Sequence, residues 1–477
     1  MSKSLSEFGR TVLVQFKTTN NVKIGSPLDI PIDIDADGLQ LICDTLNPDE
    51  DKTPYMFFIK DSEIKTTLRN AIDSFAKNEI QMELCLEIIC AAQAIFRVES
   101  VTRCSSSISG HTDAIVSIAF SPDGSSLASG SGDTTVRFWN VLTETPLQTC
   151  QSHKSWVLAI SWSPDGERLV SGDKTGIIYI WNTKSHKQIG CLKAHKQWIN
   201  SLAWEPYHSN VECRRMASAS KDGQVIVWDT ILQKILFHLN GHTQSVSCVK
   251  WGGTKLIYTA SHDRTIKVWS AEKGILCRTL EGHAHWVNTL ALSTEYMMRI
   301  GYFDPASKFS NGMSEEAKRN VALKQYEKVR LQNERLVSGS DDFTLFLWEP
   351  ESKKKFICRM TGHQQLINDV KFSPDGLFIA SASFDKSIKL WNGHSGKYIT
   401  TFRGHVKAVY QIAWSADCRL LASCSADSTL KVWNVLKSKL IFDLPGHSDE
   451  VYALDWSPDG EKVSSGGKDR ILKIWRR

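Results

Sequence analysis

Eight stretches of the chain share one order of hydrophobic and polar positions. Each begins with a His, usually after a Gly, and continues through a short apolar run, a turn, a Ser-rich run of small residues, an Asp and a Trp. Short apolar runs bounded by turn residues predict β-strands, as at 115–120, 127–131 and 135–139. The eight His residues are His111, His153, His195, His242, His283, His363, His405 and His447, and the eight Trp residues are Trp139, Trp181, Trp228, Trp269, Trp348, Trp391, Trp433 and Trp475.

Successive His residues of the repeat are 41 to 47 positions apart, except for one interval of 80. The long interval contains a single closing Trp, so it predicts an insertion at about 293–335 rather than a lost repeat. The second half of the insertion, 314–331, has the acidic start and the spaced apolar residues of a helix, with Ala322, Tyr326 and Val329 on one side. This helix is either a solvated surface element or a docking arm for RNA or protein.

Residues 11–98 lack the repeat and follow another pattern. The expected elements are strands at 11–16, within 23–34, at 55–59 and within 88–98, and a helix at 38–46. Strand, strand, helix, strand and strand in fewer than 90 residues is consistent with a small α+β ubiquitin-like (β-grasp) domain. Residues 1–10 are expected to form a flexible tail.

The charge of each region indicates its kind of partner, and the cysteines indicate the redox environment of the protein. Residues 1–98 hold 10 Lys and Arg against 15 Asp and Glu, a net charge of −5, whereas the rest of the chain carries +10. The basic region after residue 98 can lie near phosphate, and the acidic region 1–98 favours a different partner. The 12 Cys residues show no paired metal-ligand spacing, which favours reduced thiols in an intracellular protein. We expect no intrinsic metal or cofactor.

The period and the His, Asp and Trp positions over residues 99–477 resemble the WD-repeat β-propeller family. The fold class is then mainly β, an eight-bladed propeller with four strands per blade, preceded by the ubiquitin-like domain. The strand-like segment 98–108 precedes the first repeat and is expected to pair with the last blade. That pairing would close the ring and remove both exposed sheet edges at the seam.

In WD-repeat proteins the repeated polar residues form a buried chain of hydrogen bonds from Trp through Ser or Thr and His to Asp. Pairs in this structural role include His111 and Asp133, His242 and Asp263, and His405 and Asp427. The second repeat has Thr175 where the other seven have Asp, so its network is expected to be shorter. A nucleophile would be needed once and not in every repeat, so these residues indicate packing rather than catalysis.

Variable positions near the start of each repeat predict a binding surface. The residue four after each His is always Ile or Val and should point between blades, so its neighbours should lie near the mouth of the central channel. These neighbours are Trp156, Trp198 and Trp286 three after His, and Asn200, Asn288, Asn368, Tyr410 and Tyr452 five after His. Exposed aromatic rings beside amides are typical of binding hot spots. The alternative is that the Trp rings only fill gaps between blades.

The two regions together resemble the Notchless family. The resemblance rests on 14–16, 27–32, 54–55 and 61–64 in the first domain, on the join at 93–104, and on 129–139 and 338–348 in the propeller. It implies a non-enzymatic assembly factor of the large ribosomal subunit, located in the nucleolus and nucleoplasm and without a membrane partner. Its partners would be pre-ribosomal proteins, other assembly factors and rRNA, and it would be monomeric within the particle. The resemblance also implies that the AAA ATPase midasin pulls on the ubiquitin-like domain.

In this family an acidic residue of the ubiquitin-like domain completes the coordination of a divalent cation, expected to be Mg²⁺, in midasin's adhesion-site domain. We expect Glu63 to be this residue, because it follows the third strand in a polar turn, and Asp61 is the alternative. A carboxylate oxygen is the ligand that a hard cation prefers. Nearby acidic residues could steer the domain to a cation or simply form a solvated surface; they are Asp33, Asp35, Asp37, Asp49, Glu50 and Asp51.

Two other classes of function stay open. A propeller of this kind also suits a substrate adaptor of a ubiquitin ligase or a regulator of Notch signalling. An enzyme would need one acid–base cluster outside the repeat at the channel mouth, and the sequence shows none.

Overall fold

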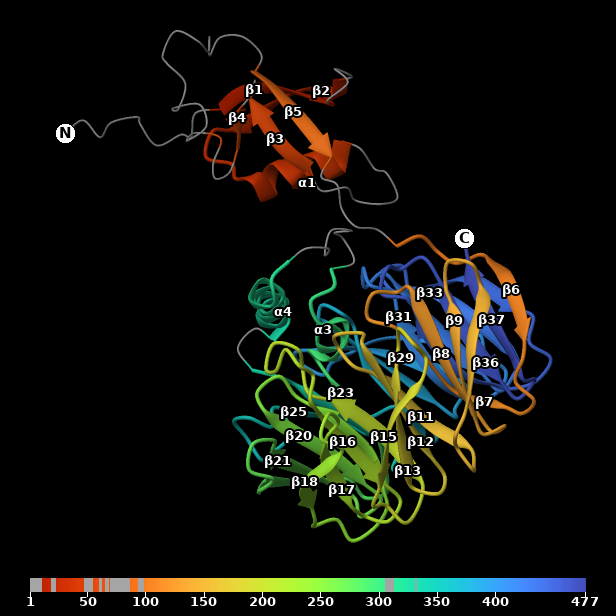
Figure 1. Cartoon of the computed structure of the whole chain (residues 1–477). Helices are drawn as coiled ribbons and strands as arrows, with labels where there is room; N and C mark the ends of the chain where they lie inside the picture. Colours follow the sequence, from red (N-terminus) through yellow and green to blue (C-terminus); the bar gives the residue numbers. More distant parts are fainter. Residues whose placement is uncertain are drawn as a thin grey trace. The chain divides into compact units, whose positions relative to one another are not determined.

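The computed structural model describes residues 11–18, 23–46, 55–59, 62–64, 68, 86–92, 98–304, 313–330 and 333–477. The chain divides into two compact units, Met1–Phe96 and Arg97–Arg477, and Figure 1 labels many of their elements. The tail expected at 1–10 lies outside the described residues. None of the described helices is both long enough and apolar enough to cross a membrane.

The first unit contains one mixed sheet in the order β2-β1-β5-β3-β4. Its elements are β1 (Thr11–Thr18), β2 (Lys23–Pro31), α1 (Ala36–Leu46), β3 (Tyr55–Ile59), β4 (Ser62–Glu63) and β5 (Leu86–Ala92). Strands β1 and β5 run parallel, and the other neighbours are antiparallel. Helix α1 begins after Asp35, whose carboxylate accepts the N–H of Gly38 at 2.9 Å as an N-cap. The core holds fully buried Val14, Phe16 and Leu39. The predicted order of elements is confirmed, with β4 added at the sheet edge.

The second unit contains eight four-stranded antiparallel sheets in the residues that the structure describes, one for each repeat. The inner strands are β7 (Ile115–Phe120), β11 (Val157–Trp162), β15 (Ile199–Trp204), β19 (Val246–Trp251), β23 (Val287–Leu292), β27 (Ile367–Phe372), β31 (Val409–Trp414) and β35 (Val451–Trp456). The second strands are β8 (Ser126–Ser131), β12 (Arg168–Asp173), β16 (Arg215–Ser220), β20 (Leu256–Ser261), β24 (Leu336–Ser340), β28 (Phe378–Ser383), β32 (Leu420–Ser425) and β36 (Val463–Gly467).

The third and outer strands complete each sheet. The third strands are β9 (Thr135–Asn140), β13 (Ile177–Asn182), β17 (Val225–Asp229), β21 (Thr265–Ser270), β25 (Leu345–Trp348), β29 (Ser387–Asn392), β33 (Thr429–Asn434) and β37 (Ile471–Arg476). The outer strands are β10 (Thr145–Gln151), β14 (Gln188–Lys193), β18 (Lys234–Leu239), β22 (Leu276–Glu281), β26 (Cys358–Met360), β30 (Tyr398–Arg403), β34 (Lys439–Pro445) and β6 (Arg103–Ser109).

Neighbouring inner strands contact each other around a closed ring, from β7 through to β35 and back to β7. The outer strand of the last blade is β6, which pairs antiparallel with β37, so the predicted closure is confirmed. The Ile or Val four after each repeat His is fully buried in all eight blades, which is the packing between sheets that the pattern predicts. We call the side on which the inner strands begin the strand-start face, and the opposite side the strand-end face.

The insertion lies between β23 and β24, and its described residues form two helices, α3 (Glu295–Ile300) and α4 (Glu315–Arg330). Helix α4 matches the predicted helix, and its apolar side is buried at Ala322, Tyr326 and Val329. The ring of Tyr326 stacks on that of His208 with centroids 4.4 Å apart. The apolar side of α4 therefore packs on the propeller, and its other side faces solvent. Helix α3 was not predicted.

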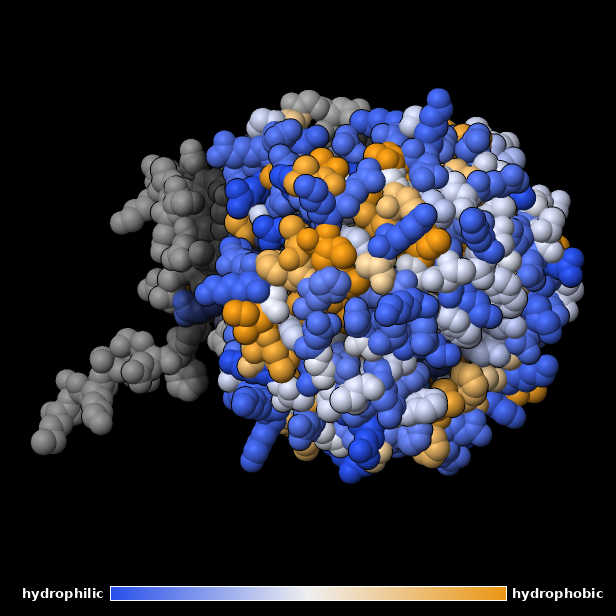
Figure 2. All heavy atoms as spheres, turned by 60° about the horizontal axis from the view of Figure 1, so that its bottom comes forward, coloured by the Kyte–Doolittle hydropathy of each residue, from blue (hydrophilic) through white to orange (hydrophobic). Residues whose placement is uncertain are grey.

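Exposed apolar side chains gather on the outer strands and on the turns that precede them. They include Ile189, Ile231, Leu232, Ile235, Leu236, Ile275, Leu276, Phe356 and Ile357. Figure 2 shows apolar patches on one side of the molecule, each surrounded by hydrophilic surface. Small apolar patches of this kind are common on soluble proteins.

Candidate functional site

Each blade is held by one buried chain of hydrogen bonds. In the seventh blade Trp433 Nε1–H donates to Ser423 Oγ at 2.9 Å, and Ser423 Oγ lies 2.8 Å from His405 Nε2. His405 Nδ1 lies 2.9 Å from Asp427 Oδ2. Since the hydroxyl accepts from Trp, it donates to Nε2, which leaves Nδ1–H to donate to the carboxylate. The same arrangement joins His111 to Asp133 and His242 to Asp263, with Thr259 as the hydroxyl in the latter blade.

The second blade has a complete network, so the prediction of a shorter one is wrong. Asp173, the last residue of β12, lies with Oδ2 3.0 Å from His153 Nδ1, and both side chains are fully buried. Its Oδ1 accepts the hydroxyl of Thr175 at 2.6 Å. Asp173 thus takes the role that Asp residues two positions later in the repeat have elsewhere. Asp173 is present in the sequence, but it is eight residues before Trp181, and the repeated pattern places the Asp six residues before the Trp.

The network carboxylates are ionised in the folded protein. Burial alone raises the pKa of a carboxyl group, but hydrogen bonds from His195 and from backbone N–H groups lower the pKa of Asp222 to about 2. The pKa of Asp133 is also lowered, because bonds from His111 and Thr135 outweigh its burial. The hydroxyl residue, His and Asp of every blade therefore hydrogen-bond to one another, and their role is structural.

The lowered pKa values predict loss of stability in acid. An unfolded Asp titrates near pH 3.9, so the stabilisation from Asp222 is complete above that pH and is lost as the pH falls through its folded pKa of about 2. We expect the urea midpoint of the propeller, followed by Trp fluorescence, to decrease between about pH 4 and pH 2. Asp222→Asn should lower the midpoint at pH 5 and flatten this decrease. An equally steep decrease in the variant would contradict the assignment.

The strand-start face carries the predicted aromatic positions. Trp156, Trp198 and Trp286 are 44%, 37% and 44% exposed, so these rings do not fill closed gaps between blades. Lys174 Nζ lies 5.6 Å from the ring centroid of Trp156 and 4.7 Å from that of Trp198. Lys221 Nζ lies 4.3 Å from the ring of Trp198. The sequence interpretation missed both lysines, although each follows the second strand of its blade at an equivalent turn.

The three Asn residues five after His are half-buried and bridge neighbouring blades. Asn200 Nδ2–H donates to the carbonyl of Val246 at 2.7 Å. Asn288 makes the equivalent bond to the carbonyl of Ile367 at 3.0 Å, and Asn368 donates to the carbonyl of Tyr410, one position further along the repeat, at 2.6 Å. These amides join consecutive inner strands, a role that the sequence interpretation did not foresee. That the same side chains contact a partner stays a prediction.

Tyr410 and Tyr452 form a separate group on the opposite part of the strand-start face. Both hydroxyls donate to Glu450 Oε2 at 3.1 Å. Burial and the hydrogen bond to Glu450 raise the pKa of each Tyr to about 12. Both phenols are therefore neutral donors at physiological pH, and they share one carboxylate.

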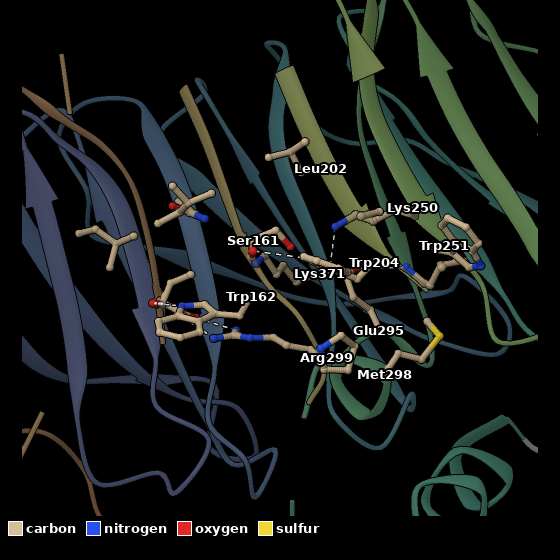
Figure 3. A pocket seen from close by; sticks show the side chains of 18 of the residues that line it. Ser161, Trp162, Leu202, Trp204, Lys250, Trp251, Glu295, Met298, Arg299 and Lys371 are labelled. Atoms are coloured by element: carbon tan, nitrogen blue, oxygen red, sulfur yellow. Dashed lines mark hydrogen bonds and ion pairs between the residues drawn. The ribbon is translucent and has the colours of Figure 1, made fainter. Parts of the chain in front are cut away.

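The strand-end face is crossed by α3. Arg299 donates to both carboxylate oxygens of Asp455 in β35, and Nη1 lies 2.9 Å from Oδ1. Glu295 pairs with Lys250 in β19 of the fourth blade, whereas Asp455 belongs to the eighth blade. Figure 3 shows side chains of α3 and of the inner strands meeting around a cavity of about 240 Å³. Although burial opposes both charges, the attraction between them raises the pKa of Lys250 and lowers that of Glu295. Helix α3 of the insertion therefore lies across this mouth of the channel.

Glu63 is the second residue of the two-residue edge strand β4, where its backbone is paired with that of Phe58. The next residue, Ile64, is buried in the core of the first unit. The backbone of Glu63 thus lies in the edge strand of the sheet, and its role at a partner's metal stays a prediction. Asp61, Asp49, Glu50 and Asp51 lie outside the described residues. Asp33 and Asp35 are exposed. In the described parts of the chain no three His, Cys, Asp or Glu residues are grouped as a metal site would require.

Two family models match the chain. The NLE (NUC135) domain matches residues 12–72. The WD domain, G-beta repeat, matches seven segments, at 102–140, 144–182, 186–229, 233–270, 354–392, 396–434 and 438–476. The interval between the fourth and fifth of these contains β22 to β25 and the insertion, which explains why seven matches accompany eight sheets.

The matched relatives align with about four-fifths of this chain. Protein Notchless of Drosophila melanogaster is 52% identical over 370 residues, which is 76% of this chain and 75% of the relative. The Notchless protein homolog of Arabidopsis thaliana is 51% identical over 392 residues, 82% of each chain. Ribosome assembly protein 4 of Saccharomyces cerevisiae is 46% identical over 396 residues, 79% of this chain and 76% of the relative.

Among solved structures, the computationally designed Ika8 protein is similar to the propeller. It has a TM-score of 0.62 and 26% identity, and the match covers 79% of this chain and all of that chain. The NLE match, the WD repeats and the identity of about 50% over most of each relative agree with one another. The chain belongs to the Notchless family.

Proposed function

We propose that this protein is a non-enzymatic assembly factor of the large ribosomal subunit. The propeller binds the pre-ribosomal particle in the nucleolus and nucleoplasm. Midasin grips the first unit, and its ATP-driven force remodels the particle. The observation that carries the assembly role is the yeast relative named ribosome assembly protein 4, with 46% identity across most of both chains.

The two-unit architecture supports separate roles for the propeller, which anchors the protein, and for the first unit, which midasin pulls. The propeller is a closed ring with networks in every blade, which suits a rigid anchor. The first unit is a small separate domain with its own core, which suits a handle. A force applied to a separate domain reaches the ring through the chain that joins them.

The metal-bridging role of Glu63 deepens this proposal. Mg²⁺ is bound by about six oxygen atoms at 2.0–2.1 Å, and one residue on an edge strand can supply only part of that set. The first unit would therefore offer a single carboxylate, and midasin would supply the cation and the other ligands. When bound, the cation would join the two proteins without reacting.

The test measures binding of the full chain to the metal-site domain of midasin, in Mg²⁺ and in chelator. We expect Mg²⁺-dependent binding for the unchanged protein and loss of binding for Glu63→Ala. Glu63→Asp should bind weakly, because its carboxylate is one methylene shorter and Mg²⁺ tolerates little change in distance. The matched control is Glu87→Ala, which removes an exposed carboxylate of β5 that pairs with Lys17 at 2.6 Å.

All variants should still sediment with the pre-ribosomal particle. Binding that resists both chelator and Glu63→Ala would refute the metal bridge. Absence of binding by the folded, unchanged chain would refute midasin as the partner.

Regulation of Notch signalling is a second candidate, supported by the name of the Drosophila relative, Protein Notchless. It predicts a complex with a membrane receptor or its pathway components rather than with pre-ribosomal RNA. Purification of the tagged chain followed by sequencing of bound RNA separates the two.

A further inference from the structure

Three tryptophans of the propeller differ from all the others. Thirteen of the sixteen Trp side chains are less than 9% exposed, and only Trp156, Trp198 and Trp286 are exposed. All three occupy the same position of the repeat, on the strand-start face of the second, third and fifth blades. Exposing so large an apolar ring to water is unfavourable, so a group of exposed Trp side chains indicates a surface that binds a partner.

Cations and flat rings alternate between these tryptophans. Lys174 lies over Trp156 and Trp198, and Lys221 lies over Trp198. In the fourth blade His262 stacks on Trp286, with centroids 4.5 Å apart and ring planes 9° from parallel. We call these six residues the lysine–tryptophan arc; they are Trp156, Lys174, Trp198, Lys221, His262 and Trp286.

The charge of the strand-start face differs from blade to blade. Lys154 and Lys196 are also exposed beside the arc, one residue after the repeat His of the second and third blades. In the first and eighth blades the equivalent turns hold Asp113, Asp449 and Glu450. Among the described residues no carboxylate forms an ion pair with the four lysines. Unpaired positive charge therefore surrounds Trp156 and Trp198. Beside Trp286 the position of Lys174 and Lys221 is taken by Asp341, which accepts from Asn288 at 2.6 Å.

We propose that the lysine–tryptophan arc binds single-stranded RNA, with bases stacked on the indoles and phosphates paired with the lysines. The inference rests on the proposed function, which brings the propeller to a ribosomal particle. Each ammonium group now covers an indole face. On binding it moves to a phosphate, and a base takes its place on the ring. Unpaired bases are required, because bases within a duplex do not expose their faces.

An acidic peptide would satisfy only half of this surface. Its carboxylates could pair with the lysines, but they would leave the faces of the indoles without a partner. Single-stranded RNA supplies a flat ring and an anionic group in every nucleotide, which matches the alternation in the arc. The overall charge of +10 outside residues 1–98 adds attraction for a polyanion.

The test measures binding of the full chain to a fluorescein-labelled 12-nucleotide oligouridine by anisotropy, at several salt concentrations. Lys174→Gln with Lys221→Gln should weaken binding about tenfold and reduce the slope of log K against log salt by about 1.4. Trp156→Ala with Trp198→Ala should weaken binding at least about tenfold, while Phe at both positions should retain most of it. Stacking should also quench Trp fluorescence in the unchanged protein.

The matched control is Lys354→Gln with Lys355→Gln, which removes the same charge from exposed lysines before β26. Equal weakening by this control, or loss of affinity without any dependence on the two tryptophans, would overturn the proposal. Displacement of the RNA by equimolar polyglutamate would also overturn it, in favour of an acidic protein partner. None of these variants changes Glu63, so Mg²⁺-dependent midasin binding by each of them shows whether the wider proposed function stands.

Discussion

Asp173→Ala should lower the free energy of unfolding by about 3 kcal/mol, because it leaves a buried network without its anion. Thr175→Ala should cost only about 1 kcal/mol, the usual value of one hydroxyl hydrogen bond. Asp173 uses both oxygens, with Oδ2 3.0 Å from His153 Nδ1 and Oδ1 accepting the N–H of Thr175 at 2.8 Å and of Ile177 at 3.0 Å. Its side chain is fully buried.

The measurement is the urea midpoint of the propeller, followed by Trp fluorescence and by differential scanning calorimetry. Asp427→Ala and Thr429→Ala in the seventh blade are the matched pair, because Asp427 and Thr429 make the corresponding bonds there. The two Asp variants should lose similar amounts of stability. A larger loss in Thr175→Ala than in Asp173→Ala would show that the second blade is held in another way.

Arg299→Met should lower the free energy of unfolding by about 2 kcal/mol, because it leaves Asp455 buried without its cation. Asp455 is 6% exposed and accepts from both terminal nitrogens of Arg299 and from the backbone N–H of Phe120 at 2.8 Å. Arg299 also donates to the carbonyl of Phe120 at 3.3 Å. One side chain thus ties α3 to both the first and the last blade.

Urea unfolding gives the loss, and hydrogen exchange locates it. Amides of α3, such as that of Met298, which donates to the carbonyl of Thr294, should exchange faster in Arg299→Met. Lys328→Met on the exposed side of α4 is the control and should change stability by less than about 0.5 kcal/mol. Adding Asp455→Asn should recover part of the loss, because a neutral amide is less costly to bury than a carboxylate. No difference between Arg299→Met and the control would show that α3 is not held by this pair.

The repeat, the first domain and the helix α4 were predictable because their signals are local. The 42-residue spacing fixes the blades, and the apolar side formed by Ala322, Tyr326 and Val329 indicates a packed helix. The network residues were predicted as a set, but Asp173 was missed. Its place at the end of β12 is two residues from the usual turn position, and only the three-dimensional distance to His153 shows the equivalence.

The position of α3 across the mouth of the channel depends on contacts that the sequence does not display. Arg299 and Asp455 are 156 residues apart in the chain, and neither belongs to the repeated pattern. The same reason hid the bridging role of the three amides. Each donates to a backbone carbonyl of the next blade, a contact that the repeated pattern does not indicate; the residues are Asn200, Asn288 and Asn368. Conversely, the exposure of the three tryptophans follows from their position in the repeat.

Strand β6 has a consequence for the newly made chain. Ser105 and its partner Ile474 in β37 are 369 residues apart. At roughly 5–20 residues per second, β6 leaves the translating ribosome roughly 20–70 s before β37 is made. An unpaired strand in that interval can pair with other chains and aggregate. The sequence of β6, Arg-Cys-Ser-Ser-Ser-Ile-Ser, contains one large apolar residue, whereas β18 reads Lys-Ile-Leu-Phe-His-Leu. The strand that waits longest for its partner therefore exposes little apolar surface during synthesis.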